Sequence, residues 1–148
     1  MKRIMIDYSK CDGCKNCVTA CMQAHRETPG TVYDLDLTDI HNESRNHIVC
    51  DGKGVYYPIF CRHCDSPECL MSCMSGALSK DPATGLVLYD ESRCGSCFMC
   101  VMNCPYGVLK PDTATHQKVI KCDFCTHLDG EPSCVKSCPK KAIFVEEV

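Results

Sequence analysis

Sixteen of the 17 cysteines in this 148-residue chain fall into four groups of four, and this spacing constrains the fold more than any other feature. Only Cys50 stands outside the groups. Cysteine makes up about 11% of the chain, a level typical of scaffolds built on disulfides or metals. With no Trp and four Phe, the other apolar side chains are too few for a conventional core. The groups are Cys11, Cys14, Cys17 and Cys21; Cys61, Cys64, Cys69 and Cys73; Cys94, Cys97, Cys100 and Cys104; and Cys122, Cys125, Cys134 and Cys138.

The first residues of the chain favour metal binding over disulfide bonds. Secreted disulfide scaffolds follow a signal peptide, but here a three-residue apolar run ends at Asp7. An odd number of cysteines also disfavours complete pairing. Because no apolar stretch reaches about 18 residues, we expect no membrane span. We therefore expect a cytoplasmic, reduced protein whose thiols bind metal.

The first and third groups have the spacing Cys-x2-Cys-x2-Cys-x3-Cys, and Pro105 directly follows the third. This is the run of bacterial ferredoxins, in which three thiolates hold one iron-sulfur cube and the fourth reaches a second cube. Four zinc sites are the alternative, but structural zinc is normally held by two separate Cys-x2-Cys pairs. Sixteen ligands in this pattern predict four 4Fe-4S clusters.

The groups are of two alternating types, which indicates a repeat of half-ferredoxin units. Groups one and three follow a short strand, whereas groups two and four precede one. Residues 77–80 and 86–89 around the turn 81–85 predict a hairpin. Strands at 3–7 and 142–146 are expected to form the equivalent pair, which would bring the two chain ends together.

The predicted fold class is a small, metal-dependent α+β protein with two dicluster ferredoxin-like modules, one inserted within the other. The outer module comprises residues 1–54 and 111–148, with a strand-rich insertion at about 22–54, and the inserted module comprises 55–110. Pairing group one with two and three with four is the alternative. The absence of a hairpin pattern at 110–117 favours the nested arrangement.

The repeat also predicts which cysteines share a cluster, because each set takes three ligands from one group and the fourth from its partner group. Cys50 lies in a strand pattern and is expected to be a buried free thiol, not a ligand. The expected ligand sets are Cys11, Cys14, Cys17 and Cys138; Cys21, Cys122, Cys125 and Cys134; Cys61, Cys64, Cys69 and Cys104; and Cys73, Cys94, Cys97 and Cys100.

The segment between groups one and two is expected to cover one flank of the metal core. Residues 32–40 alternate between apolar and polar side chains, which predicts a strand. Residues 48–50 and 55–57, separated by the turn 51–54, predict a hairpin.

Charge bears on the partners of the protein and on the potentials of its clusters. To the formal charge of −3, each oxidised cluster with its thiolates would add about −2, which disfavours nucleic acid as a partner. A basic residue precedes the first cysteine of three groups, namely Lys10, Arg93 and Lys121. A cation there would raise a cluster potential, although a solvated side chain is the commoner case. We expect His63 and His127 to be exposed and not ligands.

The sequence contains no Gly-rich phosphate loop, flavin or nicotinamide fingerprint, or nucleophile with a base.

Through Cys61-Arg-His-Cys64, Cys122-Asp-Phe-Cys125 and their continuations, the chain resembles the sixteen-cysteine electron-transfer subunits of the dimethyl sulfoxide reductase type. Its compact Cys73-Met-Ser-Gly-Ala77 and Cys104-Pro-Tyr-Gly107 are similar to the ferredoxin-like subunit associated with carbon monoxide dehydrogenase.

This resemblance implies a non-catalytic relay that carries four 4Fe-4S clusters. The implied donor is a low-potential metalloenzyme such as carbon monoxide dehydrogenase, and the implied acceptor is a hydrogenase or a flavoprotein. The alternatives are an electron-transfer subunit of a formate dehydrogenase or hydrogenase complex, and a zinc- or iron-binding regulatory module. An enzyme with a substrate-open cluster is a further hypothesis, against which the completeness of every group speaks.

Overall fold

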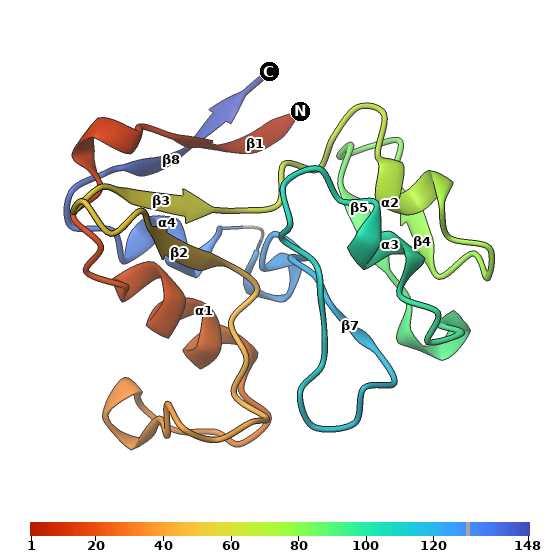
Figure 1. Ribbon diagram of the computed structural model, residues 1–148, viewed down its shortest axis with the longest axis horizontal. Coiled ribbons are helices and arrows are strands. Elements are labelled where there is room, and N and C mark those ends of the chain that lie inside the picture. The colour runs from red at the N-terminus through yellow and green to blue at the C-terminus, as the bar shows by residue number, and fades with distance from the viewer. Residues whose placement is uncertain (130) are drawn as a thin grey trace.

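A computed structural model describes residues 1–129 and 131–148 of the chain. Its short elements are grouped in two lobes (Figure 1). The terminal lobe contains both chain ends and helices α1 (Asn16–His25) and α4 (Ser133–Lys136), which pack on each other. The central lobe contains α2 (Glu68–Met71) and α3 (Met99–Met102). Over the described residues, the helices are too short or too polar to cross a bilayer.

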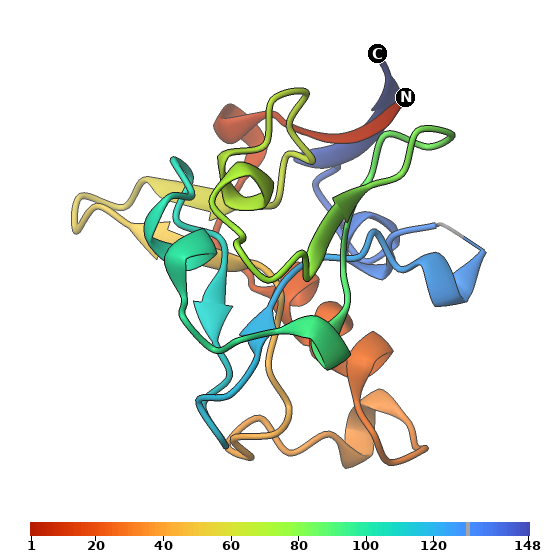
Figure 2. The same ribbon diagram turned by 90° about the vertical axis from the view of Figure 1, so that its right-hand side faces the viewer.

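The strands form antiparallel pairs, each a separate two-stranded sheet. β1 (Lys2–Ile6) pairs with β8 (Ile143–Glu147), and β4 (Leu78–Lys80) pairs with β5 (Val87–Tyr89). Both pairings were predicted from the repeat and are confirmed. Figure 1 and Figure 2 accordingly place the two chain ends side by side. The remaining pairs are β2 (His47–Cys50) with β3 (Tyr56–Ile59), and β6 (Lys110–Pro111) with β7 (Val119–Ile120).

The turn between β4 and β5 is closed by the side chain of Asp81. Its carboxylate accepts hydrogen bonds from the Ala83 N–H at 3.0 Å and the Thr84 hydroxyl at 2.6 Å. Gly85 has a φ of +73°, a left-handed conformation that a residue without Cβ adopts at little cost. The Asp81 hydrogen bonds and the left-handed Gly85 therefore suffice to reverse the chain between β4 and β5.

The β2–β3 hairpin was predicted and is confirmed, and it projects from the body of the molecule (Figure 2). It spans the expected module boundary at residues 54 and 55. Cys50, at the end of β2, is exposed, so the prediction of a buried thiol was wrong. The reason is that β2 and β3 form a two-stranded ribbon, whose loop end is not covered by a further layer.

The prediction of a strand at residues 32–40 is wrong. This stretch contains the 3-10 helix η2 (Val32–Asp34) followed by turns. Asp36 accepts the Thr38 N–H at 2.8 Å, and Asp39 accepts the His41 N–H at 2.9 Å. Side chains that bond to the backbone this closely compete with strand pairing, so alternation alone was misleading.

The expectation that residues 110–117 form no hairpin is also wrong, because β6 and β7 pair across a seven-residue loop, 112–118. Asp112 organises this loop. Its carboxylate accepts backbone N–H groups from Thr115 at 2.7 Å and from Gln117 and Lys118 at 3.0 Å. A loop held by one buried carboxylate has no dipeptide turn signal in its sequence, which explains the error.

The buried side chains form two clusters in which cysteines take the place of larger apolar residues. One joins the lobes, since Ile4 and Ile143 of the terminal sheet pack with Phe60 and Leu86. The other lies in the central lobe around Val87 and also contains Cys61 and Cys100. The core is therefore continuous with the cysteine groups.

Candidate iron-sulfur centres

The loops that carry the cysteines share a backbone feature. In all four groups the residue two positions after the first cysteine has a positive φ, and these residues are Gly13, His63, Ser96 and Phe124. Three of the four are not glycine, and left-handed backbone at such residues costs energy and concentrates at functional sites. Successive N–H groups in this conformation form an anion-binding concavity, as a thiolate site requires.

Groups one and three also begin in the same way, as the repeat predicted. Asp7 accepts the Ser9 N–H before the 3-10 helix η1 (Tyr8–Lys10), and Asp90 accepts the Ser92 N–H before η3 (Glu91–Arg93). Each 3-10 helix ends at the first cysteine of its group. The local sequence therefore positions both loops by the same capping device.

The fold brings the cysteines together in sets drawn from different groups. Three cavities are each lined by four cysteines, and their other walls are largely apolar, for example Ile48 and Ile143, Val87 and Val108, or Phe60 and Phe124. We call them site A (Cys11, Cys14, Cys17 and Cys138), site B (Cys21, Cys122, Cys125 and Cys134) and site C (Cys61, Cys64, Cys69 and Cys104).

A fourth set belongs to the central lobe, where Cys100 lies on α3. Burial raises the pKa of the Cys100 thiol, and the neighbouring Cys73 and Cys94 add to this effect, so these three sulfurs lie close together. Cys97 is in the exposed loop between Cys94 and Cys100. We call this set site D (Cys73, Cys94, Cys97 and Cys100).

All 17 cysteines are free thiols in the structure, and burial makes some of the grouped ones resist ionisation. Burial raises the pKa of Cys17 to about 12 and that of Cys69 to about 11, and thiolates of the same set add to both shifts. Without a cation these sulfurs would stay protonated at neutral pH. A bound metal would replace the protons and remove the repulsion, so the donor sets suit a thiolate-ligated metal group.

The buried ring of His63 provides a second test of whether site C suits a bound cluster. The ring is 2% exposed, so the prediction of an exposed histidine was wrong, because His63 lies between Cys61 and Cys64 on the inner side of the loop. Its Nδ1 accepts the Val87 N–H at 3.0 Å, and burial lowers its pKa to about 3. The proton is then on Nε2, which has no hydrogen-bond partner among the described residues. A cluster at site C would supply the missing acceptor.

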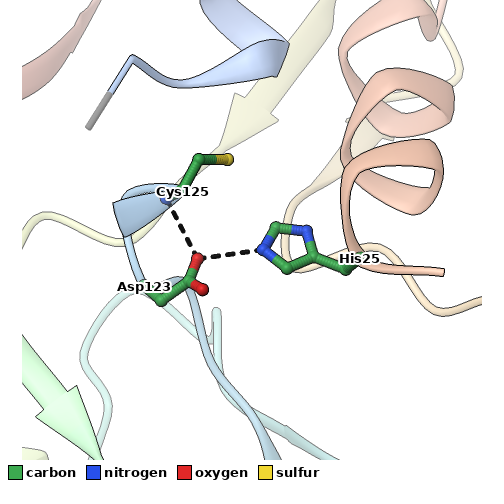
Figure 3. Close-up of side chains that lie close together, drawn as sticks. All are labelled: His25, Asp123 and Cys125. Atoms are coloured by element: carbon green, nitrogen blue, oxygen red, sulfur yellow. Dashed lines mark hydrogen bonds and ion pairs between the residues drawn. The ribbon is translucent and has the colours of Figure 1, made fainter. Parts of the chain in front are cut away.

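Site B is supported by a partly buried ion-pair network (Figure 3). Asp123 Oδ1 accepts His25 Nε2–H at 2.9 Å and the Cys125 N–H at 3.0 Å, while Oδ2 lies 3.0 Å from Arg45 Nη1. Burial opposes ionisation, but the His25 hydrogen bond and the Arg45 charge hold the pKa of Asp123 well below its usual range. The network ties α1 and the residue-45 segment to the loop of site B.

His25, Asp123 and Cys125 lie close enough to suggest a separate metal site, but their hydrogen bonds argue against one. Nδ1 of His25 bonds the Cys21 carbonyl at 2.8 Å, and Nε2 bonds Asp123, so both ring nitrogens are engaged. Burial disfavours the charged ring, but the bonds to Asp123 and Cys21 outweigh it and raise the pKa of His25 to about 9. His25 is therefore a hydrogen-bond donor that supports site B, a role that its sequence position alone did not reveal.

The predicted basic residues fall in different environments. Lys10 and Arg93 are exposed and pair with Asp7 and Asp90 in their own 3-10 turns. Lys121, in contrast, is 3% exposed and lies against Cys61. His127 is exposed, as predicted.

Comparison with known proteins identifies the kind of site. The family model described as "4Fe-4S dicluster domain" matches residues 53–148. The electron transport protein HydN of Escherichia coli (strain K12) is 32% identical over 154 residues, covering 95% of this chain and 85% of HydN. These matches confirm iron-sulfur sites of the 4Fe-4S type and a non-catalytic electron-transfer chain, and leave the number of clusters as a prediction.

Two further relatives are parts of larger enzymes. The beta subunit of the NADH-dependent phenylglyoxylate dehydrogenase of Aromatoleum evansii is 36% identical over 140 residues, covering 95% of this chain. The chain spans 29% of that subunit's length. A chain of the active site complex BamBC of benzoyl coenzyme A reductase, solved with zinc, matches with a TM-score of 0.52 and 27% identity, covering 100% of this chain and 80% of that one.

Proposed function

This chain belongs to the 4Fe-4S dicluster family, and from that premise we propose that it is an electron relay with four 4Fe-4S clusters, one at each of sites A to D. When bound, such clusters supply one-electron oxidation and reduction. The chain itself supplies the thiolates, excludes water and fixes the order of the sites. The ligand sets are those expected from the crossover of the repeat, with Cys50 not a ligand.

We further propose that electrons pass through the sites in the order A, B, C, D. Cys17 of site A and Cys21 of site B are one turn apart on α1. Burial raises the pKa of Cys122 of site B, and the nearby Cys61 of site C adds to it. Cys69 of site C and Cys73 of site D are likewise four residues apart, across α2 and its C-terminal turn.

The exposure of the cysteines carries this proposal. Of the sixteen grouped cysteines, Cys14 and Cys97 are exposed, and all the others are buried or partly buried. These two belong to sites A and D, which are the two ends of the proposed order. A relay needs end sites that a redox partner can approach and middle sites shielded from solvent, and this distribution matches that need.

The nested modules are part of the proposal. The outer module would hold sites A and B and the inserted module sites C and D. The pairing of β1 with β8 and of β4 with β5 supports this division. The boundaries expected from the sequence, after residues 54 and 110, are each crossed by a hairpin, β2–β3 and β6–β7, so we place the first boundary after β3 and the second after β7.

The partner is proposed to be a redox enzyme of which this chain is the electron-transfer subunit. The relatives described above name a phenylglyoxylate dehydrogenase and a benzoyl coenzyme A reductase complex, and none of them names carbon monoxide dehydrogenase. They name no formate dehydrogenase or hydrogenase either, but they favour that alternative, an electron-transfer subunit of an oxidoreductase complex, over a link to carbon monoxide dehydrogenase. Exposed Met74 and Met102 flank site D and offer an apolar contact there.

Anaerobic purification with iron and sulfide analysis tests the number of clusters. We expect about sixteen iron and about sixteen sulfide per chain, and reduction by about four electrons. About eight iron would reduce the relay to a single dicluster module. A colourless protein with about four zinc ions would refute the relay and establish the regulatory-module alternative. Identification of a large metalloenzyme that co-purifies would name the partner.

A further inference from the structure

Lys121 is a buried cation at the border between sites B and C. It directly precedes Cys122 of site B, and its Nζ lies 3.7 Å from Cys61 Sγ of site C. Nζ also donates to the backbone carbonyls of Val87 and of Cys122, the latter at 3.0 Å. Three acceptors match the three N–H groups of an ammonium, whereas a neutral amine has two. Each N–H group of the Lys121 ammonium therefore has an acceptor within reach.

No carboxylate in residues 1–129 and 131–148 forms an ion pair with this ammonium. The neighbouring Asp123 is already bound by His25 and Arg45. A buried charge without a counter-ion is strongly destabilising, so a negative partner is needed. Loaded sites B and C would each carry about −2 and would supply it from both sides.

The equivalent basic residues of groups one and three provide an internal comparison. The side chains of Lys10 and Arg93 are 56% and 68% exposed, and each has a carboxylate partner three residues away. All three residues stand directly before the first cysteine of a group. Only at group four does the fold bury the cation between two sites, because another lobe packs over it.

We propose that Lys121 raises the redox potentials of sites B and C together, so that both sites at the crossing between the two modules become easier to reduce. This inference rests on the proposed relay. A cation close to both sites favours an added electron on either one, and so raises both potentials by similar amounts. One electron leaves one site as one enters the other, no bond forms or breaks, and the ammonium keeps its protons. Lys121 thus acts on the relay through its charge and does not itself carry the electron.

The test is an anaerobic potentiometric titration of the loaded protein, followed by EPR, with Lys121→Met as the main variant. Methionine keeps the length of the side chain and removes its charge. The signals of sites B and C are identified as those altered by Cys134→Ser and Cys64→Ser. We expect both potentials to fall by about 59 mV or more, a ten-fold change in the ratio of reduced to oxidised cluster, and the potentials of sites A and D to move little.

Lys10→Met and Arg93→Met are the matched controls, since they remove an exposed cation at the same position of the repeat. They are expected to change the ratio of reduced to oxidised cluster at each site less than two-fold. Lys121→Arg is expected to give potentials close to those of the unchanged protein. Four intact clusters whose potentials move no more in Lys121→Met than in the controls would overturn the inference and leave the relay intact. A protein without iron-sulfur clusters would overturn both.

A loss of iron in Lys121→Met would be resolved by Lys121→Gln and Lys121→Arg. Iron retained by the arginine variant and lost by the glutamine variant assigns the effect to charge and supports the inference. Equal loss from both variants assigns it to packing and overturns the inference.

Discussion

Replacing Cys21 by serine tests the crossover between groups most directly. Cys21 lies one turn after Cys17 on α1, yet the two line different cavities. Cys17 shares its cavity with Cys138, whereas Cys21 shares one with Cys122 and Cys134. Cys21→Ser is therefore expected to disturb site B and to leave site A loaded.

The expected cost follows from the cross-link that a cluster at site B would form. A cluster at site A already joins α1 to Cys138, so site B closes only the additional loop between α1 and the segment of residues 122–134. That loop contains about 8 residues through Cys134 and about 20 through Cys122, for which the chain-entropy model of a cross-link gives about 2.5–3 kcal/mol. In a chain of this length, such a loss lowers the melting midpoint by about 6–12 °C. Iron should fall from about sixteen to about twelve atoms per chain.

The assay compares iron content, EPR spectra and anaerobic melting curves for Cys21→Ser and Cys134→Ser. These positions are far apart in sequence but line one cavity, so both variants should lose the same signal. Cys50→Ser is the control, since Cys50 is exposed and outside the sites, and it should keep all iron. Loss in Cys21→Ser of the same signal that Cys17→Ser loses would refute the crossover between groups.

Three further predictions follow from the same structure. Chelation should abolish most of the circular dichroism signal, because the clusters replace a missing core; a cooperative melt of the apoprotein would contradict this. Asp112→Ala should cost about 2 kcal/mol in chemical denaturation, because hydrogen bonds from Thr115 and Lys118 outweigh burial and hold the Asp112 pKa below its usual 3.8. This contribution is present above about pH 4 and is lost as pH falls through the folded-state pKa, so the two proteins should converge in acid. Gly13→Ala should destabilise more than Gly107→Ala, since both have positive φ but at Gly13 an added Cβ would clash with the ring of Tyr56, whereas at Gly107 it would meet nothing; equal melting points would exclude the clash.

The sequence by itself determined the parts of this protein that depend on local spacing. A cysteine triplet at intervals of three can wrap one corner of a cluster whatever surrounds it, so group boundaries and metal type follow from the sequence. The repeat of strand and cysteine run also predicted that β1 pairs with β8, although the two strands are at opposite ends of the chain. Segments without such a repeat were predicted less well. The alternation at residues 32–40 suggested a strand, but Asp36 and Asp39 bond their own backbone instead.

Only the tertiary structure decided which side chains are withdrawn from water. Lys10, Arg93 and Lys121 occupy one position of the repeat, but burial depends on what another part of the chain places above each of them. His63 is buried for the same reason, although its sequence position suggested an exposed side chain. Spacing along the chain fixes where ligands can be, whereas the dielectric and the neighbouring charges that set potentials arise from packing between distant segments.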